Sequence, residues 1–212
     1  MPNKSGRAYA LTTLCPIKND VIPDASGDRL SGQSYTAYVR EILQEFPLDE
    51  RSPMAKVPGT YFCRFYLLTD LMYGGKPDSY DELMSNYLVF TANFHGELEP
   101  YLTGMWNHAE PSIHAIWKYC VGFEQVHSAP RFLEYIQKCQ VETTFFFNGS
   151  NDEPLEEQLK GLYLKQEFAR FAVENQGKPP AELQKAFREF VSRTQPAKLA
   201  SPSWRPGQAT LS

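Results

Sequence analysis

The sequence lacks most of the patterns that assign a function directly. It contains no nucleophile elbow, phosphate-binding loop or dinucleotide fingerprint. Its four cysteines form no CxxC pair, which argues against a zinc site or a redox dithiol of that spacing. No stretch approaches the roughly 20 apolar residues of a membrane-spanning helix, and the first residues lack the apolar core of a signal peptide. We therefore expect a cytoplasmic protein with reduced, mostly buried thiols.

The distribution of charged residues also gives no functional signal. The formal net charge is −4, and the sequence contains no cluster of basic residues. Neither a nucleic-acid backbone nor an anionic membrane surface therefore has an electrostatic partner in this chain. In contrast, 42% of the residues are hydrophobic and 14% are aromatic, which suffices for one good core in 212 residues.

The spacing of apolar residues predicts four strands and five helices. Ser34 is a candidate cap for the first helix, and Pro111 is expected to bend the second. The predicted strands are 8–17, 60–71, 87–94 and 141–147. The predicted helices are 34–46, 98–120, 128–136, 154–175 and a last one around 183–191.

This order predicts an α+β protein with a ferredoxin-like β-α-β-β-α-β antiparallel sheet and additional C-terminal helices. We expect a single domain over residues 1–193 and a disordered tail over 194–212, which is rich in proline, serine and glycine. In a ferredoxin-like sheet both crossover helices lie on one face. The other face would be covered by the C-terminal helices or by the sheet of a second subunit.

The change from strand to helix at His95-Gly96 is the most informative local feature. Gly96 can adopt the positive φ of a tight turn, and Glu97, Glu99 and Pro100 suit a first helical turn. The sequence therefore predicts that His95 lies where a strand ends and a helix begins.

Two segments resemble a group of largely uncharacterised bacterial proteins. These are Tyr61-Phe-Cys-Arg-Phe65 and Leu88-Val-Phe-Thr-Ala-Asn-Phe-His-Gly96. In that group the second strand reads His-Phe-Ala-Arg-Trp and the third ends Ser-Asn-Tyr-Asp-Gly-Ser, and the similarity spans roughly residues 57–150. The present chain differs in having Tyr61 in place of the strand histidine and His95 in place of the turn aspartate.

More broadly, the pattern resembles the dimeric α/β-barrel superfamily, which includes chlorite dismutases, dye-decolourising peroxidases and small cofactor-free monooxygenases. The resemblance implies a homodimer with a ligand pocket between sheet and helices, which in some members holds haem. The glycine-aspartate-glycine motif of the dye-decolourising peroxidases is missing.

Four residues are the candidate catalytic or binding groups. Arg64 can hold a carboxylate bidentately, or it can stack on an aromatic neighbour. His95 can act as a base, or it can be a solvated turn histidine under the influence of Glu97 and Glu99. Asn93 can orient a ligand carbonyl or cap its own turn, and Tyr61 is a weaker candidate.

A haem ligand requires a single histidine, and His114 or His127 is the candidate. A lone histidine near an apolar face is, however, more often satisfied within the core. No dedicated metal site is expected, because six residues and a proline separate His108 from His114, whereas helical two-histidine sites use i,i+4 spacing. Cys63 is interpreted as a packing residue.

The leading hypothesis is a protein that binds a hydrophobic or aromatic small molecule. If it is an enzyme, we expect it to act on this molecule by acid–base or oxidative chemistry. The alternative is a non-catalytic interaction module that uses the open face of the sheet.

Overall fold

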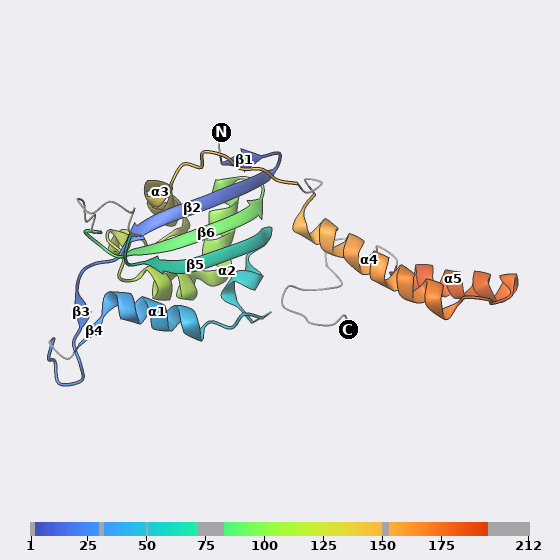
Figure 1. Ribbon diagram of the computed structural model, residues 1–212, viewed down its shortest axis with the longest axis horizontal. Coiled ribbons are helices and arrows are strands. Elements are labelled where there is room, and N and C mark those ends of the chain that lie inside the picture. The colour runs from blue at the N-terminus through green and yellow to red at the C-terminus, as the bar shows by residue number, and fades with distance from the viewer. Residues whose placement is uncertain (1–2, 30–31, 50, 72–82, 150–152, 195–212) are drawn as a thin grey trace. The chain divides into compact units, whose positions relative to one another are not determined.

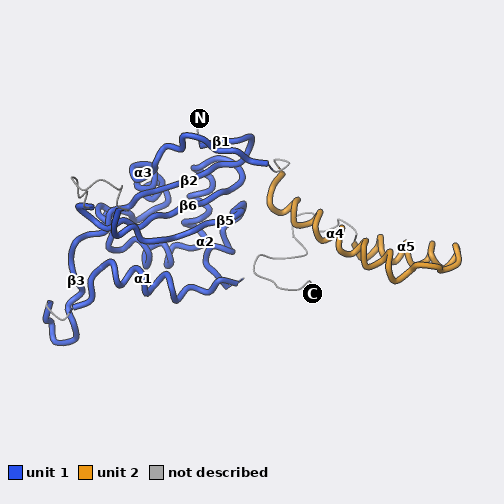
Figure 2. Tube along the Cα trace, viewed as in Figure 1, with its two compact units in different colours: residues 1–152 blue, residues 153–212 orange. Residues whose placement is uncertain are grey.

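The computed structural model describes residues 3–29, 32–49, 51–71, 83–149 and 153–194. The chain divides into two compact units, residues 1–152 and 153–212, which are coloured separately in Figure 2. The expected single domain over 1–193 stays a prediction. The expected disordered tail lies outside the described residues, apart from Thr194, where the last helix ends.

The first unit contains a four-stranded antiparallel sheet with the order β1-β2-β6-β5 (Figure 1). Its strands are β1 (Lys4–Ser5), β2 (Ala8–Pro16), β5 (Thr60–Leu68) and β6 (Tyr87–His95). A separate pair consists of β3 (Val21–Ile22) and β4 (Gln33–Ser34). The helices are α1 (Tyr35–Glu45), α2 (Leu98–Trp117), α3 (Ala129–Cys139) and the 3₁₀ turns η1 (Pro53–Lys56) and η2 (Phe123–Gln125).

The core lies on one face of this sheet because apolar residues alternate along the strands. Phe90, at the centre of β6, is fully buried and its ring stacks on that of Phe65 with the centroids 4.6 Å apart. Trp117 of α2 meets the Phe90 ring edge-on at 5.6 Å. In Figure 1, α2 lies behind the sheet, and no helix of this unit crosses the front face in the part of the chain that is described.

The strand-to-helix transition confirms the local prediction. β6 ends at His95, Gly96 has a φ of +96°, and α2 begins at Leu98. A side chain at position 96 would be strained in this left-handed conformation. The bend expected from Pro111 is also present, since Ala109 has a φ of −137° inside the helix.

The predicted strand at residues 141–147 is wrong, because these residues form no strand. The segment does approach the outer edge of β2, where Thr13 and Gln140 form an isolated bridge and the amide of Val141 donates to the Thr12 carbonyl over 2.8 Å. Farther along, β1 occupies that edge instead. The α+β class is therefore confirmed, whereas the ferredoxin-like arrangement is not.

The second unit is a pair of helices, α4 (Leu155–Glu174) and α5 (Pro180–Thr194). Phe171 and Phe190 pack with their ring centroids 5.0 Å apart. The Glu167 side chain of α4 is buried. Its carboxylate pairs with Arg170 of the same helix at 2.9 Å and with Arg193 of α5 at 3.1 Å, and therefore links the two helices. No helix in the described part of the protein has both the length and the apolar character of a membrane span.

Candidate functional site

The face of the sheet opposite the core contains a hollow of 380 Å³. The register of the strands assembles its polar wall, because Thr91 of β6 lies between Thr12 of β2 and Arg64 of β5. One step along β6, Asn93 is paired with Phe62. The hollow is lined by Leu11, Thr12, Phe62, Cys63, Arg64, Thr91 and Asn93.

Arg64 and Asn93, which the sequence singled out, are thus brought together. The Arg64 side chain is exposed, and its Nε donates to Oγ1 of Thr91 over 3.4 Å, a long and weak hydrogen bond. The guanidinium therefore keeps most of its donors for another acceptor. Phe62 stands beside it with 66% of its surface exposed, which gives the same wall an aromatic surface.

Tyr61 and His95 form a second pair at the end of β6. The Tyr61 hydroxyl lies 3.1 Å from Nδ1 of His95. In a regular strand Tyr61 would share the face of Cys63 and Phe65, but the pairing shifts between Thr60 and Phe62. This bulge adds a residue to β5 and turns the Tyr61 side chain toward His95.

Glu97, one of the two acids expected to act on the imidazole, forms an ion pair with Lys4 of β1. Its influence on His95 stays a prediction. Neither His95 nor Tyr61 is part of the hollow's lining. The structure therefore gives two neighbouring groups, an Arg64–Asn93 hollow and a hydrogen-bonded Tyr61–His95 pair.

The two candidate haem ligands line one other hollow, of 480 Å³, on the far side of α2 from the sheet. The His114 ring meets those of Trp106 and Phe123 edge-on, yet its side chain remains 44% exposed. Lys118 and Glu124 share this wall. Such charged, open surroundings do not resemble an enclosed apolar haem pocket, and haem binding stays a prediction without support.

Among the described residues, no three histidine, cysteine or carboxylate side chains converge as metal ligands. A third pocket, beside the outer edge of β2, went unpredicted. It is lined in part by Tyr135 and Cys139, neither of which the sequence analysis considered as a site residue. No spacing signal points to it, because its walls come from segments more than a hundred residues apart.

No protein-family model, curated protein or solved structure matches this chain. The resemblance to the dimeric α/β-barrel superfamily therefore stays a prediction.

Proposed function

We propose that this protein binds a small molecule with an aromatic or hydrophobic body and an anionic group in the hollow on the open face of its sheet. The observation that carries the proposal is the wall itself, which combines the Arg64 guanidinium, the Asn93 amide and the exposed Phe62 ring. A pocket of 380 Å³ lies within the range that small-molecule sites occupy.

Each wall group has a distinct task in this proposal. The Arg64 guanidinium can donate two parallel hydrogen bonds to one carboxylate, which the ammonium group of a lysine cannot do. The Asn93 side chain offers both a donor and an acceptor to a carbonyl or amide of the ligand. Phe62 provides a face on which an aromatic ring stacks.

Acid–base chemistry on the bound molecule would come from His95. It lies two residues beyond Asn93 on the same strand and face, a distance of about 7 Å in an extended chain. The Tyr61 hydroxyl is hydrogen-bonded to Nδ1 of the imidazole, so Nε2 is the nitrogen that would meet a ligand. His95 is then the proton acceptor and Tyr61 a positioning residue.

The test is binding of simple aromatic carboxylates, such as benzoate, cinnamate and indole-3-acetate, measured by titration calorimetry and ligand-observed NMR. Charge-assisted hydrogen bonds contribute about 1.5–3 kcal/mol, so Arg64→Ala should weaken binding about tenfold or more. Arg64→Lys should recover only part of it. Arg40→Ala is the matched control, since Arg40 is an exposed arginine on α1.

Binding that is insensitive to Arg64→Ala would refute the assignment. Equal weakening in Arg64→Ala and Arg40→Ala would also refute it, as would no binding of any member of the series. Turnover would be tested separately with His95→Ala. If His95 is the base, this variant retains ligand affinity but loses any reaction of the bound compound.

A second candidate function rests on the aromatic exposure of the same face. Phe62 and Tyr66 are 66% and 46% exposed on a sheet face that none of the described helices of this unit covers. Large exposed apolar surfaces of this kind are typical of interaction sites, here with a second copy of the chain. Light scattering would then give a dimer mass, and Phe62→Glu would give the monomer. A monomer mass at every concentration contradicts this second function.

A further inference from the structure

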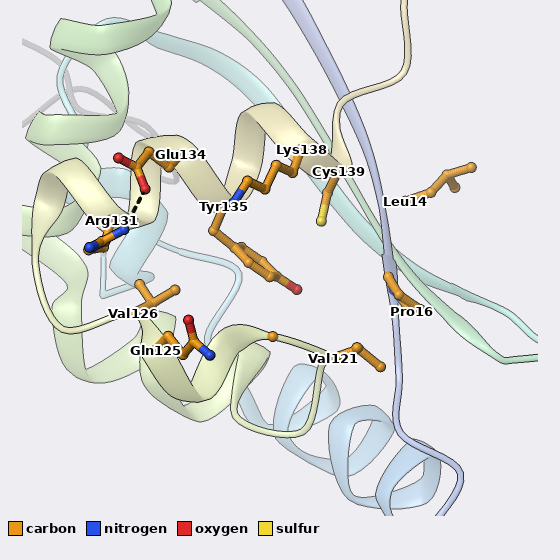
Figure 3. Close-up of a pocket in the computed structure, with 11 residues that line it drawn as sticks. Leu14, Pro16, Val121, Gln125, Val126, Arg131, Glu134, Tyr135, Lys138 and Cys139 are labelled. Atoms are coloured by element: carbon orange, nitrogen blue, oxygen red, sulfur yellow. Dashed lines mark hydrogen bonds and ion pairs between the residues drawn. The ribbon is translucent and has the colours of Figure 1, made fainter.

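The pocket beside β2 exists because the outer edge of this strand is paired only in part. Thr13 bridges Gln140, and Ile17 bridges Cys120. Between the two bridges stands Pro16, which has no amide proton with which to continue the ladder. A pocket of 340 Å³ opens in this interval, as Figure 3 shows, with Leu14 and Pro16 on one side and α3 on the other.

Two cysteines meet at this pocket. Cys139, the last residue of α3, lines it directly, and its sulfur is visible at the pocket wall in Figure 3. Cys15 lies behind the wall with no exposed surface. The indole Nε1 of Trp117 donates a hydrogen bond to the Cys15 sulfur over 3.4 Å, and the Cys15 thiol donates one to Oγ1 of Thr13 over 3.7 Å.

The backbone independently brings the two cysteines together. Gln140 is bridged to Thr13, so Cys139 and Cys15 lie one and two residues from the same bridged pair. Cys139 also packs against the buried core to which Cys15 belongs. The Cα atoms of a bridged antiparallel pair are about 4.5–5.5 Å apart, and a disulfide spans Cα separations of about 4.4–6.8 Å. A local adjustment at the end of α3 can therefore join Cys15 to Cys139.

The hydrogen bonds also distinguish this pair from the other cysteines. The Cys139 thiol, with help from Trp117, lowers the pKa of Cys15 to about 7 although burial opposes this change. Burial raises the pKa of Cys63 and of Cys120. The interaction with Cys15, together with burial, raises the pKa of Cys139, so the proton of the pair stays on Cys139 and Cys15 is the member that becomes a thiolate as the pH passes through about 7.

We propose that Cys15 and Cys139 are a redox-active pair that closes to an intramolecular disulfide when a hydroperoxide enters the pocket. The Cys15 thiolate removes the proton of the Cys139 thiol as the Cys139 sulfur, which faces the pocket, attacks the peroxide. The O–O bond breaks, Cys15 passes this proton to the leaving oxygen, and a sulfenic acid at Cys139 and one alcohol form. The Cys15 sulfur then attacks Cys139, releasing one water and forming the S–S bond. Two thiols are oxidised and one hydroperoxide is reduced.

Tyr135 supplies a donor at the same place. Its hydroxyl is buried and has no hydrogen-bond partner in the described part of the protein. Burial raises the pKa of Tyr135, so the group stays a protonated donor throughout the physiological range. A buried hydroxyl without a partner is costly, and the departing oxygen of the peroxide is an acceptor that would satisfy it.

The experiment treats the reduced full-length protein with cumene hydroperoxide and follows intact mass and disulfide-linked peptides by mass spectrometry. The expected product is lighter by two hydrogen atoms, contains a Cys15–Cys139 linkage and returns to the starting mass with dithiothreitol. Cys139→Ser is expected to abolish the mass loss. Cys63→Ser, the matched control for a half-buried cysteine, is expected to retain it.

Three results would overturn the proposal. These are a Cys15–Cys120 linkage, a sulfenic or sulfinic acid at Cys139 with no disulfide, and equal loss of reaction in Cys63→Ser. Circular dichroism of Cys139→Ser verifies its fold. Because Cys139 is only half-buried, serine is tolerated there better than at the fully buried Cys15.

Discussion

The hydroxyl of Tyr61 lies 3.1 Å from Nδ1 of His95, across a bulge that displaces Tyr61 from the alternation of its own strand. This hydrogen bond joins the edge strand β5 to the end of the central strand β6. It therefore fixes the orientation of the imidazole at the point where the chain enters α2.

Replacing Tyr61 by phenylalanine removes this hydrogen bond and keeps the ring. We expect a loss of about 0.5–1.5 kcal/mol in the free energy of unfolding, the usual net contribution of one hydrogen bond. Urea denaturation of Tyr61→Phe, His95→Ala and the double variant measures the coupling between the two residues. Additive losses would mean that the two side chains do not interact in solution.

Replacing Arg64 by alanine tests whether this residue is retained for binding rather than for stability. Its only hydrogen bond in the described structure is long, and the side chain is exposed. The free energy of unfolding should change by no more than about 0.5 kcal/mol. A larger loss in thermal or urea denaturation would assign Arg64 to the fold and weaken the binding proposal.

Phe90 is expected to be the most sensitive position of the sheet. Its ring is fully buried against Phe65 and Trp117. Phe90→Ala should destabilise the protein by about 3–5 kcal/mol, because it leaves a cavity that these rings cannot fill. Phe90→Leu fills most of the space and should cost less. Equal effects of the two substitutions in urea denaturation would contradict a close-packed core at this point.

Glu167 should control the helix pair of the second unit. Its carboxylate is buried and pairs with one arginine of each helix. In Glu167→Gln the two arginines lose their common partner, and we expect faster hydrogen exchange throughout α4 and α5. Amides of β2 and β6 should exchange as before. Glu157→Gln, at an exposed residue of α4 with a single long ion pair, serves as the control.

The oxidation of the cysteine pair should depend on pH. The pKa of Cys15 is lowered to about 7, so the thiolate form of the pair is populated above that pH and is lost below it. The initial rate of disulfide formation should therefore rise as the pH passes through about 7 and then level off. A rate that rises only near about 8.5, the pKa of an ordinary cysteine, would contradict the assignment.

The strands and helices were largely predictable because their apolar spacing is regular. β2, β6 and α2 follow the predicted ranges closely, and Gly96 marks the turn between the last two. The predicted strand at residues 141–147 was wrong because it rested on amino-acid composition alone. Phe145 and Phe147 are 82% and 74% exposed, since β1 takes the edge position that a fourth strand would need.

The candidate sites were less predictable than the elements that form them. Arg64 and Asn93 were found because strand alternation specifies a face. The bulge at Tyr61 has no signature in sequence, since it arises from the pairing of two strands. Cys15 and Cys139 are separated by most of the first unit, and long-range contacts such as the bridge from Thr13 to Gln140 bring them together.

The bulge in β5 has a further consequence for the protein in concentrated solution. β5 is the terminal strand of its sheet, with nine residues whose outer backbone groups are a template for intermolecular strand addition. The extra residue at Tyr61 breaks the regular spacing of those groups and increases the local twist. We therefore expect a second chain to align poorly along the whole edge, which would disfavour growth into fibrils.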